Sequence, residues 1–184
     1  MPRPPKGPLL NPRMSQRGQS LVEFALSSVV LLLLVGGLVD IGRAIYISEA
    51  ISNAAREGAR HGAWYDAPRQ THPWLSDGEI KSVVDAELAT VSIPASTLKT
   101  NGTSCPAPTD GNSYHNPPFA NSAYPGTANQ AWLYICYTSS SGPPPSTDLN
   151  VIVLYSYGPL TPLITAQFGT FHLASNVHMT VQGS

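Results

Sequence analysis

The side chains that most often carry out catalysis or bind metals are few in this sequence, and they are not arranged for either task. The 184 residues include five histidines, at positions 61, 72, 115, 172 and 178. Their spacing matches no metal-site motif, and the chain contains no G-x-S-x-G, P-loop or H-E-x-x-H sequence. Two cysteines are too few for a Cys-based zinc site. We therefore expect no enzymatic activity, no metal and no cofactor.

Two acidic side chains flank a long apolar segment. Residues 24–39 carry no charge, and extending this segment to residues 21–41 gives a helix of about 31 Å, long enough to cross a bilayer. Glu23 then lies inside one edge of the span, and Asp40 lies near the other. A carboxylate at the membrane edge is costly unless it is paired. Glu23 is therefore expected to have a cationic partner; the alternative is a glutamate that is protonated or reaches the interface and has no role.

The flanking charges predict how the segment is oriented. Residues 1–17 contain four basic side chains and no acidic one, which leaves six basic against eleven acidic side chains in the rest of the chain. The basic flank is expected to stay cytoplasmic, and the residues beyond 41 are expected to face outward. An acidic outer part argues against nucleic acid as a partner. The alternative is a secretory signal peptide, against which Glu23 and the lack of an A-x-A site directly after the apolar run both argue.

Three runs of sequence resemble proteins of the Tad pilus system. RGQSLVEFAL, residues 17–26, resembles the processing site of Flp-type prepilins, in which a leader is cut after a glycine and a glutamate is the fifth mature residue. GQSLVEFAL…GRAIY…AAREGARHGA in residues 18–63 and VLYSYGPLTPLITAQFG…HLASNVHMTV in residues 153–181 resemble TadE-like pseudopilins. The resemblance implies cleavage after Gly18, a new N-terminus at Gln19, and Glu23 as mature residue five.

These three residues also have a physical logic. Gly18 lies just outside the apolar span, and a glycine has no side chain to obstruct a membrane protease and is expected to break the helix locally. Cleavage would create an α-amino group at Gln19, and Glu23 is one helical turn away on the same face. Pairing of Glu23 with this amino group, or with that of a neighbouring subunit, would fix the axial register of packed helices.

The helical pattern continues beyond the membrane to residue 62. No proline occurs between residues 41 and 62, and the small residues Ala54, Gly58 and Gly62 recur every four positions. Rows of this kind allow two helices to approach closely. The sequence leaves open whether the row packs against a partner helix, against the protein's own sheet, or against both at different points along the helix.

The part beyond residue 62 is expected to be an α+β domain with a pilin-like fold. Ser76 and Glu79 fit a capping box at the start of a helix over residues 77–90. Three runs rich in β-branched and aromatic residues predict strands over residues 131–139, 150–157 and 171–181. A further short strand is possible over residues 96–100. Short connections between consecutive strands predict a small antiparallel sheet with the long helix packed across it.

Two connections complete the predicted domain. Pro162 and Gly169 fit the first turn and the end of a short helix within residues 159–168. Cys105 and Cys136 bound a loop rich in Pro, Asn, Ser and Gly. Outside the cytoplasm these cysteines are expected to form a disulfide; the alternative is two free buried thiols.

Together these features predict a non-enzymatic, single-pass protein of the cytoplasmic membrane. We expect a cytoplasmic leader over residues 1–18, a transmembrane and extended helix over 19–62, and an extracytoplasmic domain over 63–184. The resemblance implies a TadE-like pseudopilin or minor pilin that acts in assembly of Flp-type pili. It also implies its partners: a prepilin peptidase, other pilin or pseudopilin subunits and the Tad membrane platform. The alternative function is a membrane-anchored binding or adhesion module unrelated to pili, with tyrosine and tryptophan side chains as its surface.

Overall fold

The structure is a computed structural model that describes residues 13–64, 76–102, 105–112, 115–139 and 146–182. The chain divides into two compact units, residues 1–39 and residues 40–184, and helix α1 (Arg13–Ala63) contributes to both. Most of the basic leader, residues 65–75 and residues 140–145 lie outside the described residues.

The first unit is the N-terminal part of α1. Its apolar side chains are exposed; Leu21, Phe24 and Leu32, for example, are at least 70% exposed. The helix contains an 18-residue window of mean hydropathy 2.4, which makes it long and apolar enough to cross a membrane. The predicted apolar helix is therefore confirmed.

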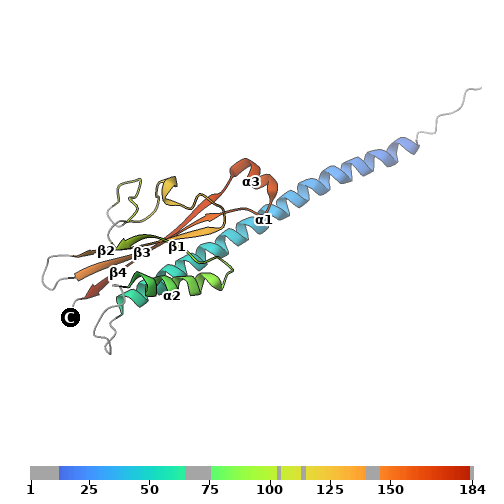
Figure 1. The fold of residues 1–184 in the computed structure, drawn as a ribbon. Helices are drawn as coiled ribbons and strands as arrows, with labels where there is room; N and C mark the ends of the chain where they lie inside the picture. The colour runs from blue at the N-terminus through green and yellow to red at the C-terminus, as the bar shows by residue number, and fades with distance from the viewer. Residues whose placement is uncertain (1–12, 65–75, 103–104, 113–114, 140–145, 183–184) are drawn as a thin grey trace, which may run out of the picture. The chain divides into compact units, whose positions relative to one another are not determined.

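In the second unit, α1 and α2 (Asp77–Ala89) pack together on one face of a sheet (Figure 1). The buried face of α1 consists of residues three or four positions apart, namely Ile47, Ile51, Ala54, Ala55 and Ala59. On α2 the fully buried residues recur every four positions, namely Ile80, Val84 and Leu88. Helix α2 matches the predicted helix, but the Ser76 side chain does not form its half of the predicted capping box. The Ser76 side chain makes no capping hydrogen bond; instead its carbonyl accepts the Glu79 and Ile80 N–H groups at 3.0 and 3.2 Å.

The sheet has four strands in the order β1-β2-β3-β4. Their bounds are Thr97–Gly102, Gln130–Ser139, Ser146–Tyr157 and Phe171–Gln182. Strands β2, β3 and β4 are antiparallel as predicted, but β1 runs parallel to β2. A parallel pair requires a long crossover, and the connection between β1 and β2 is long enough to provide one. The expectation of a wholly antiparallel sheet was wrong for β1, whereas the α+β class is confirmed.

The two faces of the sheet are covered by different parts of the chain. Along β3, the residues that pack toward the helices alternate with those that pack the other way; the first set is Leu149, Val151, Val153, Tyr155 and Tyr157. Ile152 and Leu154 on the opposite face contact Phe119 and Tyr124 of the segment between β1 and β2. This segment contains one short 3-10 helix, η2 (Asn121–Ala123). Strands β3 and β4 are joined through α3 (Pro162–Phe168), which Gly169 ends with a φ of 68°.

Candidate functional site

The three residues of the implied processing site lie on the exposed part of α1. Gly18, Gln19 and Glu23 are all exposed, and a Cβ added at Gly18 would have no atom within 4 Å. Helical geometry places Gln19 and Glu23 one turn apart on the same face. The helix runs through Gly18 without interruption, so the expected local break at this glycine was wrong.

Asp40, the first residue of the second unit, is the most heavily hydrogen-bonded carboxylate at this end of the domain. It is only 4% exposed. One carboxylate oxygen accepts the Leu160 N–H at 2.7 Å, and the other accepts the Thr161 N–H at 3.0 Å. The Tyr157 hydroxyl lies 3.0 Å from the Asp40 carbonyl oxygen, to which it donates, and 3.4 Å from the carboxylate. Asp40 thus joins the start of this part of α1 to the connection between β3 and α3.

Tyr157 and Arg43 complete the cluster around Asp40. Burial raises the pKa of the Tyr157 hydroxyl, and the nearby Asp40 charge raises it further. This keeps Tyr157 protonated and able to donate. The Arg43 guanidinium lies 5.3 Å from the centre of the Tyr157 ring, and its Nη1 donates to the Gly158 carbonyl at 3.4 Å. The sequence placed Asp40 at the edge of the span, but nothing in it identified these partners.

The row of small residues on α1 packs inside the chain. Ala54, Gly58 and Gly62 are buried. A Cβ at Gly58 would lie 2.6 Å from Val84 of α2, and one at Gly62 would lie 2.5 Å from Leu149 of β3. Of the two arrangements that the sequence left open, the structure shows packing against the protein's own helix and sheet.

Residues 18–60 match the model of the family described as TadE-like protein. This segment is TadE-like. The match begins at Gly18, includes Glu23 and Asp40, and ends within α1. It bears out the family suspected from the sequence of this segment, whereas the tail over residues 153–181 lies outside it. No curated protein and no solved structure matches the chain.

The glycines of the TadE-like segment provide a matched pair of substitutions. We expect Gly58→Leu to destabilise the domain by about 2 kcal/mol or more, because the Cβ alone would lie 2.6 Å from Val84. The overpacking cost is therefore at the upper end of the usual range of about 1–3 kcal/mol and exceeds the gain of about 1 kcal/mol in helix propensity. Gly42 lies on the same helix with no atom within 4 Å of an added Cβ, so Gly42→Leu is expected to be neutral or stabilising. Denaturant unfolding of the two variants in detergent measures the difference. Equal stability of both would contradict the close packing of Gly58.

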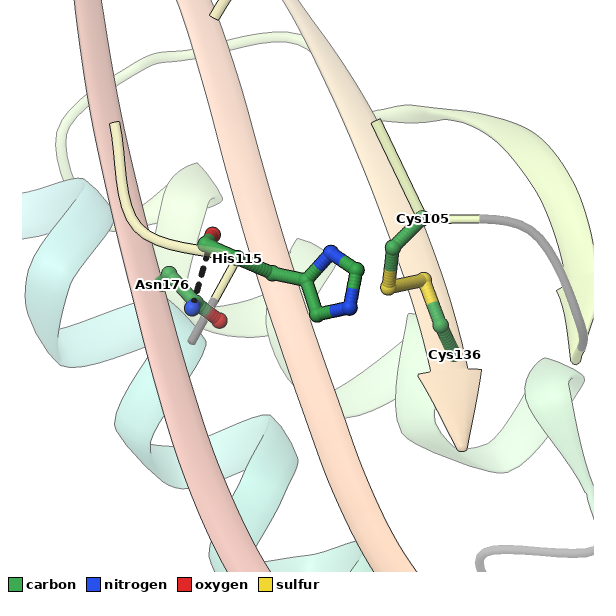
Figure 2. Close-up of a disulfide and its surroundings, with 4 residues drawn as sticks. All are labelled: Cys105, His115, Cys136 and Asn176. Atoms are coloured by element: carbon green, nitrogen blue, oxygen red, sulfur yellow. Dashed lines mark hydrogen bonds between the residues drawn. A yellow bond between two sulfur atoms is a disulfide. The ribbon is translucent and has the colours of Figure 1, made fainter. Parts of the chain in front are cut away.

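The two cysteines form the predicted disulfide. Cys105 and Cys136 are bonded, and their Cα atoms are 5.6 Å apart. In Figure 2 the His115 ring points toward this bond, and the backbone carbonyl of His115 accepts the Asn176 Nδ2–H at 2.9 Å. The bond attaches the start of the loop segment to β2, and the hydrogen bond attaches a later part of the same segment to β4.

The described histidines lie far apart or beside single partners. His172 stacks on Tyr124 with ring centres 4.1 Å apart, and His178 lies 3.5 Å from Asp148. Among the described residues, no group of three His, Cys, Asp or Glu side chains is placed to hold a metal ion. His72 lies outside the described residues. The absence of enzymatic activity stays a prediction.

Proposed function

We propose that this chain is a pseudopilin or minor pilin of an Flp-type (Tad) pilus. The observation that carries the proposal is the coincidence of a TadE-like segment with an exposed apolar helix. The helix presents Gly18, Gln19 and Glu23 at its N-terminal end in the order that the family's processing requires. A prepilin peptidase cuts after Gly18, and the partners in assembly are other pilin or pseudopilin subunits and the Tad membrane platform.

In this proposal the N-terminus is cytoplasmic and the α+β domain is outside. The four basic residues before Gly18 favour this orientation. The disulfide is consistent with it, because such bonds persist mainly in oxidising compartments. Glu23 pairs with the new α-amino group of Gln19 on its own or a neighbouring helix. The pair offsets the cost of a carboxylate at the membrane edge and sets the register between subunits.

The proposal is tested by mass spectrometry of the mature N-terminus in cells that contain the Tad peptidase. We expect a chain that begins at Gln19, and a chain that begins at Met1 when the peptidase is deleted. A mature chain that begins at residue 45 or later would falsify processing at Gly18 and support a secretory signal peptide. A chain that stays intact in both strains would leave the membrane-anchored binding module as the better function.

The second readout is assembly by a Glu23→Ala variant. We expect this variant to insert in the membrane as the wild type does and to lose most pilus production, because the amino terminus no longer has its partner. Glu49→Ala removes another exposed glutamate of α1 and serves as the control, with pili expected at the wild-type level. Pili are counted by electron microscopy of sheared fractions. Normal pilus production by Glu23→Ala would remove the role assigned to this residue.

A further inference from the structure

The connection between β3 and β4 carries an exposed apolar patch. Leu160, Leu163 and Phe168 are 63%, 52% and 70% exposed, and Phe171 beside them is 42% exposed. Residues 158–171 contain no Asp, Glu, Lys or Arg. Exposed side chains of this size in a single uncharged segment are unusual on a soluble surface and mark a site of interaction.

The patch is held in a defined position although α3 has no buried residue of its own. The Leu160 and Thr161 N–H groups bind the two carboxylate oxygens of Asp40. The Thr165 hydroxyl donates to the Pro159 carbonyl at 3.1 Å. The backbone is therefore fixed on its polar side, and the large apolar side chains are left facing solvent.

The position of Asp40 in the chain indicates what covers the patch. Asp40 directly follows the uncharged residues 24–39, so it lies near the outer edge of the segment that is expected to cross the bilayer. Leu160, the first apolar residue of the patch, donates its backbone N–H to Asp40. Ile41 and Ile45, at the start of the domain part of α1, are also 60% and 61% exposed. Arg43 donates to the Gly158 carbonyl, which attaches the start of this connection to α1 a second time.

We propose that residues 158–171 form a membrane-docking element, with Leu160, Leu163 and Phe168 inserted at the boundary between headgroups and acyl chains. The occupant is the outer leaflet of the bilayer that the protein's own apolar helix crosses. Apolar faces of short segments bind membranes in this way, about 5–10 Å deep. The domain then contacts the bilayer both where α1 leaves it, at Asp40, and through the docking element. The proposal rests on the apolar segment spanning a bilayer and not on the role in pili.

The test uses fluorescence of tryptophans in the full chain, reconstituted in phosphatidylcholine vesicles with brominated acyl chains. The background is the double variant Trp64→Phe with Trp74→Phe, in which Trp132 is the one remaining native tryptophan. The emission of this background is subtracted from that of each probe variant. Adding Phe168→Trp to this background places an indole probe in the patch. The control is the single variant Trp74→Phe, which keeps Trp64. This residue directly follows the C-terminal end of α1, whereas the patch lies near Asp40. Trp64 is 63% exposed and Phe168 is 70% exposed, so the two positions are matched in exposure.

We expect brominated lipid to reduce the emission of the patch probe, since an indole inserted about 5–10 Å into the boundary lies close to the brominated acyl chains, and to leave the emission of Trp64 unchanged. Acrylamide in the aqueous phase should quench Trp64 and not the patch probe. Quenching of the patch probe by acrylamide but not by lipid would overturn the proposal. Protection of the patch probe from both quenchers would also overturn it and would indicate that another protein copy covers the patch. Neither result would bear on cleavage after Gly18.

Discussion

Replacing Asp40 with alanine is expected to lower the free energy of unfolding of the domain by about 3–5 kcal/mol. The loss arises because the Leu160 and Thr161 N–H groups and the Tyr157 hydroxyl all lie against this carboxylate. Charged hydrogen bonds contribute about 1.5–3 kcal/mol each, and donors left unpaired in a buried site add a further cost. The substitution also removes the desolvation cost of burying the carboxylate, so the net loss stays below the sum of these contributions.

The effect is measured by denaturant unfolding of the full chain in detergent micelles, with hydrogen exchange of the peptide over residues 158–169 as a local readout. Asp40→Asn supplies one carbonyl oxygen where two are required, so it should lose about 1–3 kcal/mol. Glu49→Ala, at an exposed position of the same helix, should change stability by less than about 0.5 kcal/mol. Unchanged exchange at Leu160 and Thr161 in Asp40→Ala would show that the carboxylate does not hold this connection.

Hydrophobic periodicity was sufficient to predict most elements of the domain. The spacing of Ile80, Val84 and Leu88 predicts α2 because residues four apart share one face of a helix. Pro162 and Gly169 predict α3 because proline suits a first helical turn and glycine adopts a positive φ at little cost. In both cases the information is local, so the sequence alone is enough.

Interactions between distant residues could not be predicted from local patterns. Asp40 bonds to residues 117 to 121 positions later in the chain, and no local pattern links them. The parallel pairing of β1 was missed for the same reason, since it depends on the path of a long connection. The row of Ala54, Gly58 and Gly62 indicates that another element packs closely against α1. Whether that element belongs to the same chain depends on where α2 and β3 lie, which the row itself does not specify.

The candidate site was predictable where it is continuous in the chain. Gly18, Gln19 and Glu23 could be singled out because the resemblance that implies a processing site is carried by a linear sequence; cleavage there stays a prediction. The exposed patch around α3 was not singled out, because Leu160, Leu163 and Phe168 resemble ordinary core residues in a sequence. Their exposure and the hydrogen bond between Leu160 and Asp40 become visible only when the fold is known.

Removing the disulfide has an expected effect of similar size to Asp40→Ala. Cys105 and Cys136 are separated by 31 positions, and closing a loop of this length is worth about 3–4 kcal/mol in the chain-entropy model. The double variant Cys105→Ala with Cys136→Ala is therefore expected to lose about that much stability, measured by denaturant unfolding. Wild type treated with reductant should approach the same midpoint, whereas reductant should leave the variant unchanged.

The loss should be uneven across the two faces of the sheet. Phe119 and Tyr124 belong to the segment that the disulfide attaches to β2, and they cover Ile152 and Leu154. Ile51 of α1, Val84 of α2 and Leu133 of β2 belong to the separate core cluster on the other face. Hydrogen exchange in the double variant should therefore accelerate first over residues 115–129, while α2 remains protected. Equal acceleration on both faces would mean that the loop segment and the helical core unfold as one unit. A midpoint unchanged from wild type would mean that the disulfide contributes no stability to the domain.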